Sequence, residues 1–325
     1  MTNMTDSTPQ TPAGPATLQP QKLEEAIRPT TMLEAPRLAA KVGVDLRLAT
    51  ETFQHTGSFK FRAAYNLVSK VANSEIIAAS SGNFGQAVAF ACSLLGKKCT
   101  IVMPSTSARV KMDSVREYGG SVDLVDVREK TRAARVAELA RENPGAFIAS
   151  AYDDPLVIQG NASLGREICA TGIDFDYVVA PIGGGGLSAG IICGIRESGK
   201  NIEVVGAEPL MGNDAARSMR AGRLIKNDVE PASIADGART LSLGTHNWEI
   251  LSKGLSGIVE VPEENIRHAV RLLFSLSNLK SEPTGALSVG AVLSQPDRFR
   301  GKSVCCIISG GNVDPETYAK ILSEQ

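Results

Sequence analysis

The sequence is poor in histidine and tryptophan and has almost no net charge, and each shortage excludes a class of function. Its 325 residues include 3 His and 1 Trp, and 34 basic side chains nearly balance 35 acidic ones. Three scattered histidines do not supply a histidine-based zinc site. A balanced charge without a basic run leaves no footprint for nucleic acid. No apolar run approaches the ~20 residues of a membrane span, so no membrane association is expected.

Two further absences concern cysteine and serine chemistry. The 6 cysteines form no CxxC pair and lie mostly in apolar runs, a pattern typical of buried free thiols in a reducing, cytoplasmic protein. A GxSxG motif is missing, which argues against a Ser-His-Asp hydrolase. The first 20 residues are polar and rich in proline without the apolar centre of a signal peptide. We expect residues 1–20 to form a disordered tail.

What the sequence does contain is an alternation of short Val/Ile-rich runs with helix-length amphipathic segments. Strands separated by helices in this way indicate parallel βαβ units and an α/β protein with open parallel sheets. In such sheets, ligands bind in the loops that follow the carboxyl ends of strands. The predicted strands cover residues 74–80, 97–104, 121–127, 174–182, 201–208, 257–262 and 302–309.

A run of four glycines follows one of these strands and precedes a predicted helix. Gly183, Gly184, Gly185 and Gly186 allow the backbone to turn several N–H groups toward an anion, and the helix N-terminus adds its positive end. Phosphate is the expected ligand. The same segment also fits the dinucleotide fingerprint through Gly184, Gly186 and Ala189, with Glu208 about 20 residues further on as the ribose ligand. The glycines alone leave both interpretations open.

Two polar loops and one lysine complete the pattern. Ser80, Ser81 and Asn83 follow a strand and open a helix, which suits a carboxylate, although a simple helix cap explains them equally well. Ser309 follows the last strand, where it could bond a ring nitrogen or only shape a turn. Lys60 lies between two phenylalanines, and burial of an amine lowers its pKa toward the range that Schiff-base chemistry requires.

In this order, the motifs TGSFKFRAA, SSGNFGQA, PIGGGGLSAG, AEPLMGND, IADG and ISGGNVD resemble the fold-type II, tryptophan synthase β-like pyridoxal-phosphate enzymes. Within them they look most like the serine/threonine dehydratase and serine racemase branch. The resemblance runs from about residue 20 to the C-terminus. It implies two open, mostly parallel twisted sheets: a large cofactor-binding domain of residues 21–69 plus 149–325, and a small mobile domain of residues 70–148. It also disfavours the nicotinamide interpretation.

The resemblance implies roles for the residues in these motifs. Lys60 would bind pyridoxal 5'-phosphate covalently and later act as the base on the substrate Cα proton, and Phe59 would stack on the cofactor ring. Asn83 would bond the ring hydroxyl, Ser309 would face the ring nitrogen, and Glu282 would be an acid near the ring. The glycine loop, Gly183 to Gly186, would hold the phosphate. The substrate would contact Ser80, Ser81, Asn83, Phe84 and Thr240.

A divalent-cation site is the other feature that the resemblance implies. Glu208, Gly212 and Asp214 match it, and oxygen donors of this kind suit Mg²⁺ or Ca²⁺. A strand-end acid that caps the following helix is the alternative for Glu208. A homodimer is also expected from this branch, and the chain ends too soon after the last motif for an appended regulatory domain.

Phe84 departs from the family pattern, which usually places histidine there. Phenylalanine cannot bond a substrate carboxylate or hydroxyl, so a bulkier or more apolar substrate is expected. Arg128, Arg132 and Arg135 lie on a predicted helix and leave an acidic substrate open. The predicted function is β-elimination from a β-hydroxy amino acid, such as L-threonine or L-serine, to a 2-oxo acid and ammonia. A racemase that uses Lys60 and Ser81, or a cofactor-binding protein without catalysis, is the alternative.

Overall fold

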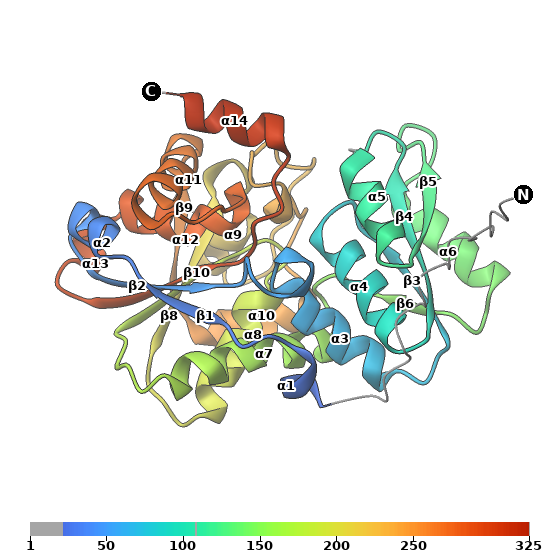
Figure 1. The fold of residues 1–325 in the computed structure, drawn as a ribbon, viewed down its shortest axis with the longest axis horizontal. Helices are drawn as coiled ribbons and strands as arrows, with labels where there is room; N and C mark the ends of the chain where they lie inside the picture. Colours follow the sequence, from blue (N-terminus) through green and yellow to red (C-terminus); the bar gives the residue numbers. More distant parts are fainter. Residues whose placement is uncertain (1–21, 108, 325) are drawn as a thin grey trace, which may run out of the picture.

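The computed structural model describes residues 22–107 and 109–324, so the predicted tail of residues 1–20 lies outside the described residues. Two sheets organise the chain (Figure 1). The larger sheet has six strands in the order β1-β2-β10-β7-β8-β9, parallel except for the antiparallel pair β1 and β2. Its strands are β1 (Thr31–Glu34), β2 (Asp45–Thr50), β7 (Tyr177–Pro181), β8 (Glu203–Pro209), β9 (Leu255–Val261) and β10 (Ser303–Ile308).

Helices cover both faces of this sheet because its strands are apolar on both sides. In β10, Cys306 and Ile308 pack into one hydrophobic cluster, whereas Cys305 and Ile307 pack into the other, as a side-chain period of two requires. The first cluster includes residues of α2 (Pro36–Val42), α11 (Glu263–Ser277) and α12 (Pro283–Ser294). The second includes residues of α7 (Pro155–Ala170), α8 (Gly186–Glu197) and α10 (Thr245–Gly254).

The smaller sheet is entirely parallel, in the order β5-β4-β3-β6. It lies to the right in Figure 1, with the six-stranded sheet to the left. Its strands are β3 (Glu75–Ala79), β4 (Lys98–Pro104), β5 (Ser121–Val125) and β6 (Phe147–Ala149). Its hydrophobic clusters take residues from α3 (Lys60–Lys70), α4 (Asn83–Leu94) and α5 (Arg109–Glu117), and from α6 (Arg132–Glu142).

The predicted fold class, α/β with two mostly parallel sheets flanked by helices, is confirmed. The domain boundaries at residues 70 and 148 stay a prediction. Phe61 and Tyr65 of α3 precede the first boundary, yet both pack into the core of the smaller sheet. The cysteines are free, and all except the half-buried Cys193 are buried.

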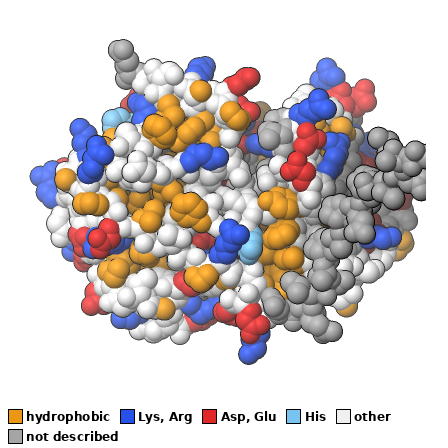
Figure 2. Space-filling model, in the orientation of Figure 1, with side chains coloured by type: hydrophobic (Ala, Val, Ile, Leu, Met, Phe, Trp, Pro, Cys, Tyr) orange, Lys and Arg blue, Asp and Glu red, His pale blue; other side chains and the backbone are white. Residues whose placement is uncertain are grey.

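Short elements complete the described part of the chain. The short helices include α1 (Leu23–Ala26), α9 (Asp214–Ala221), α13 (Pro296–Phe299) and α14 (Pro315–Ser323). Three 3₁₀ turns are η1 (His55–Gly57), η2 (Leu210–Gly212) and η3 (Asp236–Ala238). No helix of residues 22–324 that the structure describes is both long and apolar enough to cross a bilayer. On the face drawn in Figure 2, basic and acidic side chains are interspersed.

Candidate active site

Lys60 is the first residue of α3. Its Nζ donates a 2.7 Å hydrogen bond to the main-chain oxygen of Ala151 and lies 5.1 Å from the ring centre of Phe59 and 5.6 Å from that of Phe84. Burial lowers the pKa of Lys60 to about 8, and the nearby carboxyl group of Glu282 partly offsets this effect. The amine is therefore partly neutral near physiological pH, as a nucleophile or base must be.

The end of β10 lies against the segment that leads into α3. The main-chain N–H of Phe59 donates to the oxygen of Ser309 at 3.0 Å, and Ser58 pairs with Gly310 in an isolated β-bridge. These bonds bring Phe59, Lys60 and Ser309 together across a long stretch of sequence. The Ser309 hydroxyl is buried and has no hydrogen-bond partner among the described residues. A buried hydroxyl without a partner is costly, so it can serve a bound ligand.

In the serine loop between β3 and α4, one serine side chain supports the local structure and the other remains available to a ligand. The Ser80 hydroxyl accepts from the N–H groups of Gly82 and Gly85 at 3.3 and 3.0 Å, so it stabilises the start of α4. The Ser81 hydroxyl makes no hydrogen bond to the described residues and is partly exposed. Ser81 is thus free to meet a substrate, whereas the side chain of Ser80 is engaged as a helix cap.

Asn83, at the start of α4, makes partly buried polar contacts with residues that adjoin the larger sheet. Its Nδ2 donates to Glu282 Oε1 at 2.8 Å, and its Oδ1 accepts from Asn312 Nδ2 at 2.8 Å. Asn312 also donates to the oxygen of Thr56 at 2.7 Å. Burial, together with the charge of Asp236, raises the pKa of Glu282 to about 8. Glu282 is therefore mostly protonated at neutral pH and can donate a proton.

The glycine loop, Gly183 to Gly186, lies between β7 and α8. Gly185 has φ +93°, a conformation that side chains rarely adopt. A Cβ on Gly184 would collide with the Tyr152 ring, and a Cβ on Gly183 would lie 2.9 Å from the oxygen of Gly237. Among the described residues, no group accepts a hydrogen bond from the N–H groups of this loop. Unpaired N–H groups at a helix N-terminus form an anion site, as the sequence predicts.

The remaining predicted residues lie around this loop. Thr240, beyond η3, has a hydroxyl group without a partner among the described residues. Glu208 is buried and accepts from the N–H groups of Ala215 and Ala216 at 2.8 and 2.9 Å. Its pKa is raised by burial and by the charge of Asp214. Both oxygens of Glu208 therefore stabilise the first turn of α9, as expected of an acid that caps a helix.

The cation site has one unpartnered oxygen. Asp214 Oδ1 accepts from Asn227 at 2.8 Å, while its buried Oδ2 has no hydrogen-bond partner in the described part of the chain. Within the described ranges, no cluster of three or more His, Cys, Asp or Glu residues could hold a metal ion. This donor set suits a cation only through Asp214 Oδ2 and main-chain oxygen, because the Glu208 carboxylate is already bonded to α9.

The loop after β6 was not predicted to belong to the site. Ala151 accepts the Lys60 hydrogen bond, and Tyr152 lies against the glycine loop. The position of a loop after a strand could have revealed it, but β6 has only 3 residues. Lys111 was not predicted either. Its Nζ lies 2.7 Å from Asp236 Oδ2 and joins α5 to η3.

The predicted helix begins only at Arg132, which has no ion pair with the described residues. Arg128 lies in the turn before it, and both Arg128 and Arg135 are in surface ion pairs. Arg128 is paired with Asp126 at 2.5 Å, and Arg135 is paired with Asp123 at 2.8 Å. Neither is therefore a free cation for a substrate carboxylate.

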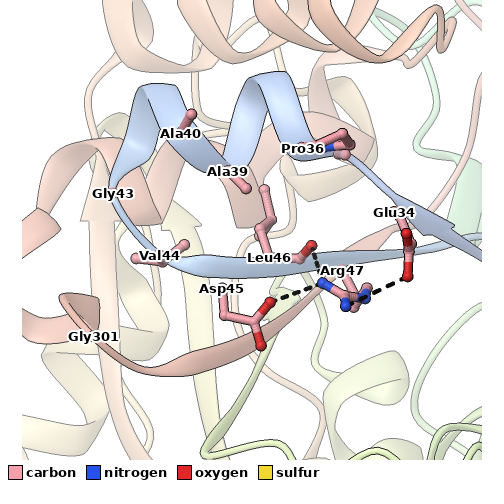
Figure 3. A pocket seen from close by; sticks show the side chains of 11 residues that line it. Glu34, Pro36, Ala39, Ala40, Gly43, Val44, Asp45, Leu46, Arg47 and Gly301 are labelled. Carbon is pink, nitrogen blue, oxygen red and sulfur yellow. Dashed lines mark hydrogen bonds and ion pairs between the residues drawn. The ribbon is translucent and has the colours of Figure 1, made fainter.

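One pocket lies away from these residues, between α2 and the start of β2 (Figure 3). Its side chains include Arg47, which lies 2.8 Å from Asp45 and 3.5 Å from Glu34. The pocket thus lies at the amino end of β2, whereas Lys60 and the glycine loop follow the carboxyl ends of strands. Chemistry in open parallel sheets belongs to the carboxyl ends.

Comparison with known proteins shows which family of proteins the whole chain resembles. A family model described as "Pyridoxal-phosphate dependent enzyme" matches residues 23–310. An L-threo-3-hydroxyaspartate ammonia-lyase of Pseudomonas sp is 33% identical over 93% of this chain and 95% of its own length. A serine racemase of Schizosaccharomyces pombe is 32% identical over 94% of this chain and 95% of its own. The crystal structure of a threonine deaminase from T.th. has a TM-score of 0.85 and 37% identity, covering 90% of this chain and 95% of that one.

Proposed function

Because the chain belongs to the family of pyridoxal-phosphate dependent enzymes, we propose that it catalyses β-elimination from a β-hydroxy amino acid such as L-threonine or L-serine. The products are a 2-oxo acid and ammonia. The observation that carries the proposal is the environment of Lys60, whose amine has a pKa lowered to about 8 and contacts no carboxylate directly. An amine in this state can both bind a carbonyl carbon and accept a proton.

The residues present fit the cofactor. Within residues 22–107 and 109–324, neither the N–H groups of the glycine loop nor the Ser309 hydroxyl has a hydrogen-bond partner. Lys60 lies near two aromatic rings. Pyridoxal phosphate, when bound, supplies the electron sink that makes the substrate Cα–H acidic. We assign Phe59 to the ring face, Asn83 to the ring hydroxyl and Ser309 to the ring nitrogen. A neutral serine at the nitrogen favours elimination over transamination.

The chain's own groups would then move the protons. Lys60 Nζ would remove the Cα proton, and the β-hydroxyl would leave as water once a nearby acid protonates it. Glu282, which is mostly protonated at neutral pH, is such an acid. Ser81, Asn83 and the main-chain N–H groups at the start of α4 bind the substrate carboxylate, with Thr240 as a further contact. Ser80 supports this loop as a cap.

Phe84 would form an apolar wall beside the substrate side chain. It is buried, and the Lys60 amine lies near its ring. We expect Phe84→His to lower activity on L-threonine and bulkier β-hydroxy amino acids relative to L-serine. The relative rates of 2-oxo acid release would measure this change, and unaltered ratios would exclude a role for Phe84 in selectivity.

One other reaction, racemisation, and one other substrate class, acidic β-hydroxy amino acids, have specific support. Ser81 is free of hydrogen bonds to the described residues, so it could return a proton opposite Lys60, as a serine racemase requires. Relatives named for hydroxyaspartate favour an acidic β-hydroxy substrate. Arg128 and Arg135 are engaged in surface ion pairs, which leaves Arg132 as the predicted arginine without an ion pair among the described residues.

Three further features belong to the same proposal. A Mg²⁺ or Ca²⁺ ion would bind through Asp214 Oδ2 and the Gly212 carbonyl, and Glu208 would join them only if its carboxylate left its bonds to α9. A homodimer and a cytoplasmic location are proposed as well, the latter because buried free cysteines suit a reducing compartment. The proposed function involves no nucleic-acid or membrane partner.

The test is 2-oxo acid release from L-serine, L-threonine and L-threo-3-hydroxyaspartate, with chiral analysis of the remaining amino acid. Release that depends on Lys60 supports elimination, and the best substrate identifies the class. Inversion without release identifies a racemase, and Ser81→Ala should then abolish inversion selectively. If no substrate reacts or perturbs the cofactor's absorbance, the elimination proposal is wrong.

A further inference from the structure

The carbonyl groups of the glycine loop, Gly183 to Gly186, are held by buried side chains that no motif singled out. Asn247 of α10 donates from Nδ2 to the oxygen of Gly184 at 2.7 Å. Asn161 of α7 donates from Nδ2 to the oxygen of Gly186 at 3.0 Å. Both asparagines are at most 1% exposed. The loop is therefore attached to two different helices through its own carbonyl oxygens.

These bonds fix the direction of the opposite N–H groups. A trans peptide is planar, so its N–H points away from its C=O. Holding the oxygen of Gly184 therefore directs the N–H of Gly185 to the other side of the loop. Holding the oxygen of Gly186 does the same for the N–H of Leu187. The intervening peptide is fixed by α8 itself, because the N–H of Ala189 donates to the oxygen of Gly185 at 2.9 Å.

The result is three successive peptides with fixed carbonyls and unpaired N–H groups. Among the described residues, nothing accepts from the N–H groups of Gly185, Gly186 and Leu187. Glycine has no side chain to restrict this segment, so the loop would otherwise sample many orientations. Preorganised donors bind an anion more tightly than donors that must be ordered on binding.

The two asparagines are oriented by their partners. Asn247 Nδ2 also donates to the oxygen of Tyr152 at 3.0 Å, so it faces two acceptors. The main-chain N–H of Gly244 shares the oxygen of Gly184 at 3.0 Å. The Oδ1 atoms of Asn161 and Asn247 are buried and have no partner among the described residues. An unpaired buried oxygen costs free energy. A nonpolar side chain would avoid that cost, which indicates that the donated bonds have a use beyond packing.

We propose that Asn161 and Asn247 are positioning residues for the cofactor phosphate. They hold the carbonyls of Gly186 and Gly184 so that the N–H groups of Leu187 and Gly185 face the phosphate. The inference rests on the cofactor of the family and not on the choice between elimination and racemisation. Its test reads cofactor binding without any substrate, so it can fail independently of the proposed reaction.

The experiment compares pyridoxal phosphate with pyridoxal, which lacks the phosphate. The full chain, freed of cofactor, is titrated with each compound, and the dissociation constants are measured by absorbance. Asn247→Leu and Asn161→Leu remove the donor and nearly preserve the side-chain shape. We expect each to weaken pyridoxal phosphate about tenfold and pyridoxal less than about twofold, since hydrogen bonds to charged groups are the stronger ones.

Asn66→Leu is the matched control. Asn66 is equally buried and donates from Nδ2 to the oxygen of Leu156 at 2.6 Å, away from the glycine loop. This variant should leave the ratio of the two dissociation constants unchanged. Equal weakening of both compounds by the loop variants, or no weakening of either, would overturn the proposal. If a leucine variant does not fold, the corresponding serine variant is measured with the same expectation.

Discussion

Lys60 and Arg62 are two basic side chains on the first turn of α3, and they meet opposite surroundings. The Arg62 guanidinium contacts Glu51 at 2.7 Å and Glu167 at 2.6 Å. The Lys60 amine instead donates to a neutral carbonyl, that of Ala151. The pKa of Arg62 is raised by its two carboxylates, whereas that of Lys60 is lowered to about 8 by burial. Both cations are buried, but only Arg62 has carboxylate partners; the Lys60 amine contacts a carbonyl instead, so burial lowers its pKa.

Arg62 and Lys60 therefore have different roles on the same helix: the first holds the helix in place, and the second is the candidate reactive group. Arg62 is buried together with Glu51 and also donates to Ser163 at 2.9 Å. This cluster attaches the start of α3 to β2 and α7. Because Lys60 lies on the same turn, the ion pairs of Arg62 also fix the position of Lys60. The following substitutions test whether the two residues really divide these tasks.

Lys60→Met should have the largest effect, and it should appear in activity alone. Removing the amine that would bind the cofactor and accept the Cα proton should lower turnover by at least about 10³-fold. The free energy of unfolding of the cofactor-free protein should not decrease, because a poorly solvated amine is lost. Turnover and urea unfolding are the two measurements.

Lys70→Met is its control on the same helix. Lys70 is exposed and bonds Gln159 at 2.7 Å, so neither turnover nor unfolding should change appreciably. Retained turnover in Lys60→Met would contradict the assignment of Lys60.

Arg62→Met should act in the opposite way and destabilise the protein by about 3–5 kcal/mol, because Glu51 would be left buried without its partner. Turnover per folded molecule should fall less than in Lys60→Met. Urea unfolding checks the prediction. The double variant Arg62→Met with Glu51→Gln should recover part of the loss, and no recovery would mean that the charge pair is not the cause.

The sequence singled out the residues of the candidate site, but it did not single out the residues that hold them in place. Lys60, Asn83, the glycine loop and Ser309 stand in short motifs, so their residues were identified directly. Arg62 stands in one of these motifs, but nothing in the sequence indicated a role for it. Its partners Glu51 and Glu167 lie far apart in sequence, and only the tertiary fold brings them together.

Local pattern also explains which elements were found. Apolar runs such as that of β10 are buried on both faces and are easy to recognise. β1 and β6 are short and only partly buried, so they lack such a run, and the loop after β6 was missed with its strand. Asn161 and Asn247 carry no local signal, because what they do depends on carbonyl groups distant in sequence.

The pH dependence of stability should sharpen the contrast between Lys60 and its carboxylate neighbour Glu282. The pKa of Lys60 falls from 10.5 in the unfolded chain to about 8, so the unfolded state binds more protons between these values. Stability contributed by Lys60 therefore rises as pH increases from 8 to 10.5. The pKa of Glu282 rises from 4.5 to about 8. Its contribution therefore falls as pH increases from 4.5 to 8.

Urea unfolding of the cofactor-free protein at a series of pH values measures both contributions, at most about 3 kcal/mol for Lys60 and about 5 kcal/mol for Glu282. The difference between wild type and Lys60→Met should change only in the alkaline window, and that between wild type and Glu282→Gln only in the acidic one. Changes in the reverse windows would show that the two pKa directions are wrong.

The smallest effect on stability is expected from a third cation, Lys111. Like Arg62 it forms an ion pair, but its pair is partly exposed to solvent. Its side chain is 25% exposed and that of Asp236 is 42% exposed, so water competes with the pair and salt screens it. Lys111→Ala should cost no more than about 1 kcal/mol, and less at high salt, in urea unfolding. Exchanging the two charges, Lys111→Asp with Asp236→Lys, should restore most of that loss. A loss above about 2 kcal/mol would exceed the range of exposed ion pairs. It would show that ion pairs stabilise this protein whether or not they are buried. The large effect expected for Arg62 would then not be explained by its burial.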